Sequence, residues 1–190
     1  GRCVCIALFF VLNEMMIIHK YLFQKYLRNY FFTKGKIEID SDYFINKIKE
    51  ACASGNNNNF KTNIEGEMTP FGHFIEDKKF LEIVPQFVKH VNQYHKFVPY
   101  GLGNAWGFEL KPNQKTRFHD HYSALWSGVI YLNDCSQELQ FPEIGECLKP
   151  EKGSFALFNG FLAHGCETNT DKVSKFGLSF NMHEVEPIVK

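Results

Sequence analysis

The last apolar stretch of the chain alternates strictly, and this pattern constrains the fold more than any other feature. In KFGLSFNM (residues 175–182), Phe176, Leu178, Phe180 and Met182 fall on one face, and the residues between them are polar or glycine. A period of two predicts a β-strand with one face packed against apolar neighbours. The chain must therefore end in a sheet whose second face is lined by polar groups.

Three earlier segments show the same character. WGFEL (106–110), SGVIYL (127–132) and GSFALFNG (153–160) are short, apolar and rich in strand-forming residues. Pro, Gly, Asn and Asp separate these segments, as expected of turns between strands. The part of the chain after residue 99 is therefore expected to be mostly β.

Helical spacing precedes the strands. SDYFINKIKEAC (41–52) has apolar residues on one helical face, with Ser41 or Asp40 as the cap. DKKFLEIVPQFVKHVNQYH (77–95) is also expected to be helical, and Pro85 should kink it or mark a restart. The apolar side of this second helix is expected to contain Phe80, Leu81, Val84, Val88 and Val91.

Helices first and short strands afterwards predict an α+β chain whose working half is a β-sandwich or jelly roll. We expect residues 15–190 to form a single domain, with a helical part at 40–97 and a jelly-roll core at about 104–183. Residues 1–14 contain ten consecutive apolar residues, too few to span a bilayer, and no small-residue cleavage site follows. We therefore expect residues 1–14 to be a leader outside the working fold.

Charge and cysteine content restrict the classes of partner. Lys plus Arg equals Asp plus Glu at 21 each, so no global charge favours nucleic acid or an anionic membrane. The six cysteines include no C-x-x-C pair, which argues against structural zinc and a disulfide framework. Free thiols in a reducing compartment are the simpler interpretation, and we expect a cytoplasmic protein without a membrane partner.

The motif RFHDH (117–121) is a candidate metal site. If it is extended, His119 and His121 lie on the same face, about 7 Å apart along the strand, and Asp120 points to the other face. Imidazole is a ligand for iron, zinc, copper and nickel. The alternative is a surface His-x-His without a metal.

A third ligand must come from elsewhere in the sequence. His164 follows a strand that ends near Phe158 and a turn that contains glycine, so it is either a ligand or a hydrogen-bonding loop residue. Lys175 lies on the polar face of the last strand, where a buried ammonium needs an anion such as a carboxylate. The alternative for Lys175 is a strand-end side chain that reaches solvent. Ordinary surface or partly buried roles are expected for the other histidines, which are His19, His73, His90, His95 and His183.

Two segments together resemble a known family. HDHYSALWSGVIYL (119–132) and GSFALFNGFLAHGCETNTDKVSKFGLSFNM (153–182) are similar to the H-x-H…S-G-V-x-Y-L segment and the distal-histidine and S-F-N segments of a branch of the 2-oxoglutarate and Fe(II)-dependent oxygenases. This branch is common in marine phages and bacteria. The resemblance covers about Trp106 to Met182, and its two parts occur in the family's order.

The resemblance implies a double-stranded β-helix, which is a jelly roll, with the N-terminal helices packed outside it. It also implies that Fe(II) is held by His119, His121 and His164. The usual ligand set is two histidines and one carboxylate. This chain has His121 in the second position, so either three histidines bind the metal or Asp120 turns in through a bulge.

The resemblance further implies that Lys175 binds the far carboxylate of 2-oxoglutarate and that Tyr131 faces this co-substrate. Asn181 lies on the same strand face as Lys175 and is a candidate cavity-lining residue. Many relatives have arginine in place of Lys175 and serine in place of Gly177. Lysine offers one charged contact where arginine offers a two-pronged one, so 2-oxoglutarate binding is expected to be weaker.

The activity implied is that of a dioxygenase, which consumes dioxygen, converts 2-oxoglutarate to succinate and carbon dioxide, and oxidises, most simply hydroxylates, an unidentified substrate. The alternatives are a cupin-like metal-binding protein or isomerase with three histidines, and a metal-free interaction domain. Residues 60–76 are expected to contribute to the mouth of the pocket. Trp106 and Trp126 either shield the site or pack in the core, and core packing is the simpler expectation.

Overall fold

The structure, a computed structural model, describes residues 30–54, 62–93 and 100–185. The chain divides into two compact units, and all the named helices and strands lie in the unit Phe32–Lys190. The expected leader at residues 1–14 falls outside the described residues, so that expectation and the boundary at residue 15 stay predictions.

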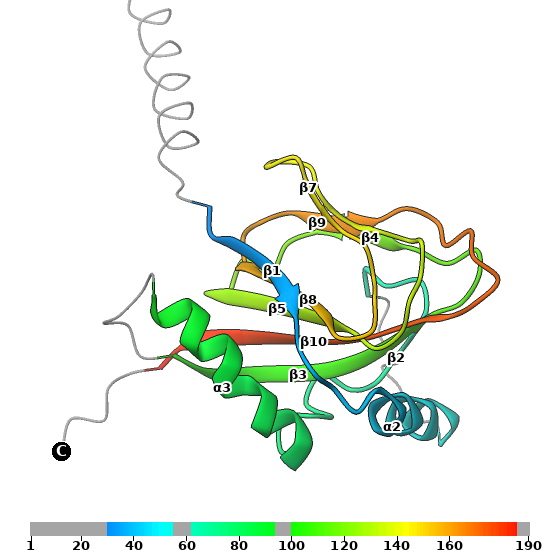
Figure 1. The fold of residues 1–190 in the computed structure, drawn as a ribbon, viewed down its shortest axis with the longest axis horizontal. Coiled ribbons are helices and arrows are strands. Elements are labelled where there is room, and N and C mark those ends of the chain that lie inside the picture. The colour runs from blue at the N-terminus through cyan, green and yellow to red at the C-terminus, as the bar shows by residue number, and fades with distance from the viewer. Residues whose placement is uncertain (1–29, 55–61, 94–99, 186–190) are drawn as a thin grey trace, which may run out of the picture. The chain divides into compact units, whose positions relative to one another are not determined.

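Two antiparallel sheets face each other (Figure 1). The larger sheet has the order β1-β8-β5-β10-β3-β2, and its strands are β1 (Phe32–Lys36), β8 (Ser154–Asn159), β5 (Trp126–Tyr131), β10 (Lys175–Glu184), β3 (Tyr100–Leu110) and β2 (Glu67–Met68). The smaller sheet has the order β4-β9-β6-β7, and its strands are β4 (Thr116–His119), β9 (His164–Cys166), β6 (Leu139–Phe141) and β7 (Glu146–Leu148). Phe141 and Phe158 join the two sheets through an edge-to-face ring contact of 4.8 Å. This arrangement is the expected double-stranded β-helix.

Both expected helices are present. Helix α2 (Ser41–Ala53) begins after Asp40, whose side chain accepts a hydrogen bond from the Tyr43 backbone N–H at 3.2 Å, so Asp40 and not Ser41 is the cap. Helix α3 (Lys78–Asn92) continues through Pro85, so the expected restart does not occur.

The expected apolar face of α3 was partly wrong. Leu81 is 43% exposed, and the side chains that face the core are Phe80, Ile83, Phe87 and Val91. These four follow a spacing of three to four residues, which places them on one helical stripe. Pro85 is exposed, and it adds no apolar area to that stripe.

The helices cover the outer face of the larger sheet (Figure 1). Phe80 and Phe87 of α3 contact Phe180 of β10, with ring centroids 5.8 and 5.0 Å apart, and Phe87 also contacts Phe155 of β8 at 5.1 Å. The apolar face of β10 therefore turns toward the helices, and its other face turns toward the smaller sheet. Lys175 and Ser179 lie on that second face and line a cavity between the sheets.

Two segments differ from expectation. Strand β1, with the sequence FTKGK, was not expected, but it pairs with β8 at the edge of the larger sheet. The region 40–97 is not purely helical, because β2 pairs with β3 there. Within the described residues, no helix is long and apolar enough to cross a membrane. The four cysteines described, Cys52, Cys135, Cys147 and Cys166, are free thiols, as expected.

Candidate metal centre and its cavities

Two histidines of the smaller sheet lie beside each other because their strands pair. His119 is the last residue of β4, His164 is the first of β9, and the two are partners in the antiparallel register. His121 lies beyond the end of β4, so the extended strand that we expected over 117–121 stops two residues short of it. A turn places His121 instead, since its backbone N–H donates to the Gly160 carbonyl at 2.6 Å and its carbonyl accepts from Ala124 N–H at 2.7 Å.

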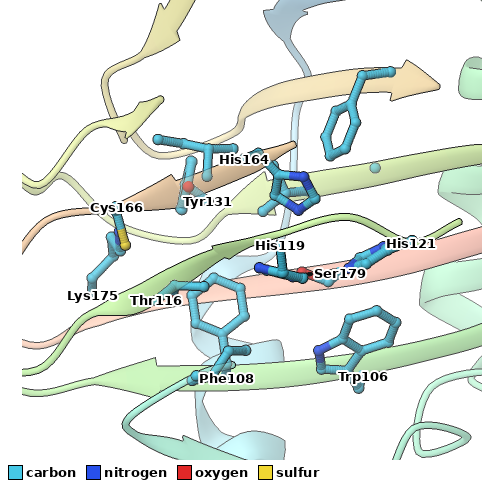
Figure 2. Close-up of a pocket in the computed structure, with 15 residues that line it drawn as sticks. Trp106, Phe108, Thr116, His119, His121, Tyr131, His164, Cys166, Lys175 and Ser179 are labelled. Carbon is cyan, nitrogen blue, oxygen red and sulfur yellow. Dashed lines mark hydrogen bonds between the residues drawn. The ribbon is translucent and has the colours of Figure 1, made fainter. Parts of the chain in front are cut away.

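The three imidazoles converge on one point (Figure 2). Their candidate ligand nitrogens all lie within 4.8 Å of one another. The Nε2 atoms of His119 and His121 are 3.1 Å apart. Two nitrogens bound at about 2.1 Å to one ion, at a right angle to each other, would be separated by about 3.0 Å. The spacing of this pair therefore fits a shared metal ion.

Hydrogen bonds on the opposite side of each ring determine which nitrogen is left for a metal. The Nδ1 atoms of His119 and His164 lie 2.8 and 2.9 Å from the carbonyl oxygens of Arg117 and Leu162. A carbonyl oxygen can only accept, so each Nδ1 carries the proton and each Nε2 presents a lone pair.

His121 is held in the same way by side chains. Its Nδ1 lies 2.7 Å from Asn181 Oδ1 and 2.9 Å from Ser127 Oγ, and the Ser127 hydroxyl donates to the same Asn181 oxygen at 2.7 Å. His121 Nδ1–H therefore donates to Asn181, and its Nε2 lone pair also faces the cluster. Three converging lone pairs repel one another unless a cation lies between them, and outer hydrogen bonds of this kind typically orient metal-binding histidines.

Burial keeps the cluster neutral. It lowers the pKa of His119 below the usual value of 6.5, and it lowers the pKa of His164 well below that value. Burial, together with the neighbouring His119, lowers the pKa of His121 to about 4. Neutral imidazole is the form that binds a metal, so the three side chains are ready as ligands at neutral pH.

Asp120 is not part of this cluster. Its Oδ1 accepts a hydrogen bond from the Tyr122 backbone N–H at 3.2 Å, and among the described residues the group of converging metal-capable side chains contains only the three histidines. The alternative in which Asp120 turns inward is therefore not the arrangement seen. His73 and His183, the other histidines whose side chains are described, also lie outside the cluster.

A cavity of about 50 Å³, called the inner cavity, lies between the two sheets beside the histidines. It is lined by Ile64, Trp106, Phe108, Thr116, His119, His121, Gly128, Val129, Tyr131, Leu139, Phe158, His164, Cys166, Lys175 and Ser179. The expected polar groups of β10, Lys175 and Ser179, thus meet the histidines in one space (Figure 2).

Lys175 is a buried cation without a carboxylate partner in the part of the chain that is described. It is 1% exposed, which rules out the alternative of a strand-end side chain in solvent. Its Nζ donates to the Gln137 carbonyl at 3.1 Å and to Cys166 Sγ at 3.4 Å, and it lies 5.4 Å from the centre of the Tyr131 ring. Burial lowers its pKa below the usual 10.5. An ammonium in such a place attracts an anion into the cavity.

Tyr131 and Phe108 line the inner cavity, and Gly177 lies between them in the larger sheet. Tyr131 is fully buried, and burial raises the pKa of its phenol well above 10, so the ring stays neutral. Gly177 is the cross-strand partner of Tyr131 and of Phe108. A Cβ on Gly177 would lie 2.4 Å from Phe108 Cζ, so the Phe108 ring occupies the space that a serine would need.

A second space of about 210 Å³, called the outer cavity, lies on the other side of His119 and His121. It is lined by Thr62, Asn63, Ile64, Met68, Phe71, Trp106, His119, Asp120, His121, Ser123 and Asn181. Five of these residues fall within 60–76, the segment expected to contribute to the mouth of the pocket. Asn181 lines this outer cavity and not the one that contains Lys175, and its hydrogen bonds are to His121 and Ser127.

The two tryptophans have different surroundings. Trp126 is fully buried and lines neither cavity, which fits core packing. Trp106 lines both cavities, and its ring centroid lies 5.9 Å from that of His121. Trp106 is also buried, at 4% exposure, so it belongs to the core as expected and lines the two cavities as well.

The sequence pattern missed Ser127 and Gln137. Ser127 is the only serine or threonine in the buried strand β5 and binds Asn181, so a small polar residue within an apolar run was the available signal. Gln137 accepts from Lys175 through its backbone carbonyl, an interaction that leaves no mark in the sequence.

No protein-family model matches the sequence, and no curated protein matches it closely enough to count as a relative. Solved structures do match. A viral collagen prolyl hydroxylase from Paramecium Bursaria Chlorella virus-1, in complex with 2-oxoglutarate, is 18% identical, with 84% of this chain and 98% of that chain covered and a TM-score of 0.64.

Two further structures extend the comparison. A prolyl hydroxylase from Trichoplax adhaerens, in complex with a hypoxia inducible factor peptide fragment, is 11% identical, with 93% of each chain covered and a TM-score of 0.64. HygX from Streptomyces hygroscopicus, with nickel and 2-oxoglutarate bound, is 10% identical, with 81% of this chain and 83% of that chain covered and a TM-score of 0.57. At these identities the likeness concerns the fold, and the chain has the double-stranded β-helix of these oxygenases.

Proposed function

We propose that this chain is an Fe(II)- and 2-oxoglutarate-dependent dioxygenase in which His119, His121 and His164 hold the iron. One observation carries the proposal: three imidazole Nε2 lone pairs converge at the wall of a cavity that also contains the buried, anion-seeking Lys175. The fold shared with 2-oxoglutarate-binding structures supports it. Bound iron would supply the activation of dioxygen and the oxidising power for a substrate C–H bond.

In this proposal the chain's own residues bind, orient and shield. Lys175 neutralises the far carboxylate of 2-oxoglutarate, and the Tyr131 ring stabilises the Lys175 ammonium through a cation–π contact. The Asn181 and Ser127 pair fixes the ring of His121. Trp106 closes the wall between the two cavities and limits the entry of water.

Three neutral ligands also affect the charge balance of the site. A divalent ion held by three imidazoles keeps its full charge of two, while a carboxylate ligand would reduce it by one. 2-Oxoglutarate brings two negative charges, one at each end. Attraction at the metal end therefore compensates for the single charged contact that Lys175 offers in place of an arginine.

The outer cavity is the proposed site of the substrate to be oxidised, because it opens beside His119 and His121 on the side away from Lys175. Its described lining includes one carboxylate, Asp120, and no lysine or arginine. A phosphate-rich substrate would find no counter-charge there. We therefore expect a neutral or cationic group to enter this cavity.

The decisive experiment measures succinate formed from 2-oxoglutarate by the purified full chain with Fe(II) and air, without any added substrate. Slow uncoupled turnover is expected, and it should be lost in His119→Ala. His183→Ala is the matched control, because it removes a histidine that lies outside the cluster. The absence of both succinate and 2-oxoglutarate binding, in a protein that retains iron, would refute the proposal.

A cupin-like metal-binding protein or isomerase is the second candidate, and it is favoured because the described residues add no carboxylate to the histidine cluster. It predicts tight binding of a divalent metal without consumption of 2-oxoglutarate. The same succinate assay, combined with metal analysis, separates the two. A cytoplasmic location and the branch common in marine phages and bacteria stay predictions that rest on the free thiols and on the motif pattern.

A further inference from the structure

Trp106 has a buried hydrogen-bond donor with no acceptor. Its side chain is 4% exposed, and its indole Nε1 has no hydrogen-bond partner among the described residues. Figure 2 shows the edge that carries Nε1 turned toward the side of Phe108, into the inner cavity. A buried polar group left unpaired is costly, and native structures rarely keep one without a reason.

A second donor lies opposite. Ser179 of β10 is the cross-strand partner of Trp106 of β3, and both line the inner cavity. The Ser179 side chain is partly buried, and its hydroxyl can donate a hydrogen bond into this space. Two donors on neighbouring strands, facing one small space, form a site for an oxygen acceptor.

The position of this donor pair relates it to Lys175. Ser179 is four residues from Lys175 on β10, which corresponds to about 13 Å along the strand, and both side chains line the inner cavity. A ligand with an acceptor oxygen at each end could therefore contact Lys175 at one end and the donor pair at the other. The histidine cluster adjoins the second end.

We infer that Trp106 binds the co-substrate directly: its Nε1–H donates to an oxygen at the metal-facing end of 2-oxoglutarate, and the Ser179 hydroxyl is the second donor. The inference rests on the proposed function, because it takes 2-oxoglutarate as the occupant of the inner cavity. It assigns to Trp106 the orientation of the co-substrate toward the metal. Packing of the Trp106 ring alone would leave its indole N–H without a hydrogen-bond acceptor.

The indole N–H can be observed directly, because the chain has only two tryptophans. In a ¹H–¹⁵N spectrum of the full chain loaded with diamagnetic Zn(II), two indole cross-peaks are expected, and Trp106→Phe assigns them. Addition of 2-oxoglutarate should move the Trp106 indole proton downfield as it gains an anionic acceptor. The Trp126 signal is the internal control, because Trp126 lines neither cavity.

Calorimetry of the same Zn(II)-loaded proteins supplies the second measurement. Trp106→Phe keeps a smaller aromatic ring and removes the donor, so 2-oxoglutarate binding should weaken about 10-fold, the effect of one hydrogen bond to a charged acceptor. Ser179→Ala should weaken it by a smaller factor. The unfolding temperature of ligand-free Trp106→Phe should fall, because the smaller ring fills less of the buried space, and this loss of packing is measured separately from the loss of 2-oxoglutarate affinity.

The outcomes separate this inference from the proposed function. If 2-oxoglutarate binds but the Trp106 signal does not move downfield and Trp106→Phe binds equally well, the inference is overturned and the dioxygenase proposal stands. If the wild type does not bind 2-oxoglutarate at all, both fail. If Trp106→Phe does not fold, Trp126→Phe assigns the two indole signals, and the indole shift in the wild-type protein decides alone.

Discussion

Replacement of Lys175 by methionine tests the central feature of the inner cavity, because it removes the charge and keeps a side chain of similar shape. In the ligand-free protein the lysine gains about 1.5–3 kcal/mol from its hydrogen bond to Gln137 and about 1 kcal/mol from the Tyr131 ring. Against this stands a desolvation cost of several kcal/mol for a cation that is 1% exposed. The free energy of unfolding should therefore change by less than about 2 kcal/mol in Lys175→Met.

The effect on 2-oxoglutarate should be much larger than the effect on stability. A charge-assisted hydrogen bond to a buried carboxylate contributes about 1.5–3 kcal/mol, which corresponds to about a 10- to 150-fold loss of affinity when the ammonium is removed. Titration calorimetry on the Zn(II)-loaded protein measures this loss, and chemical denaturation measures the stability. The signature is a large loss of binding without a matching loss of stability.

Lys111→Met is the matched control for this experiment. Lys111 is an exposed lysine whose Nζ lies 3.7 Å from Glu67, and a surface pair of this kind contributes about 0–1 kcal/mol. It should leave both stability and 2-oxoglutarate affinity nearly unchanged. A Lys175→Met protein destabilised by more than about 3 kcal/mol, with 2-oxoglutarate affinity equal to that of the wild type, would show that Lys175 is structural.

Three further outcomes are expected. Asn181→Ala should lower metal affinity about 10- to 100-fold in a competition titration, because the His121 ring loses its outer hydrogen bond; unchanged affinity would contradict that role. Gly177→Ser should cost about 1–3 kcal/mol of stability in denaturant unfolding, because its Cβ would lie 2.4 Å from Phe108 Cζ; a stability equal to wild type would contradict this packing. The folded-state pKa of His121 is about 4, below its unfolded value of 6.5, so His121 alone should cost the metal-free protein roughly 3 kcal/mol of stability as the pH falls from 6.5 toward 4. Thermal unfolding at a series of pH values measures this loss in the wild type and in His121→Ala, which should lose less stability over the same range. The same dependence of stability on pH in both proteins would refute the low pKa of His121.

The parts of the fold that the sequence predicted are those set by local pattern. The strict alternation of β10 placed Lys175 and Ser179 on the cavity face, and the structure has them there. Strand β1 could not be predicted, because its sequence contains two lysines and a glycine and it becomes a strand only by pairing with the edge of β8. Non-local pairing of this kind leaves little trace in a five-residue segment.

The candidate site shows the same division. A period of two suggested that His119 and His121 would converge, and they do, but β4 ends at His119 and the Gly160 carbonyl positions the turn that holds His121. The prediction that His119 and His121 lie together was therefore correct, but strand periodicity explains only the position of His119. The alternation of β10 could not predict which cavity Asn181 lines. A register irregularity follows Asn181 in β10, and the position of His121 determines that Asn181 lines the outer cavity.

The two cavities share residues through which binding in one could affect binding in the other. Trp106, His119 and His121 line both, so a ligand in the inner cavity changes one wall of the outer cavity. Phe71 stands at the outer side of Trp106 with its ring 5.1 Å away, and it is 45% exposed. If the Trp106 N–H is fixed by 2-oxoglutarate, the surface that Phe71 and Trp106 present to the substrate becomes fixed at the same time. Under the proposed function, occupation of the inner cavity would then precede productive binding in the outer one, because 2-oxoglutarate would first orient the Trp106 side chain that both cavities share.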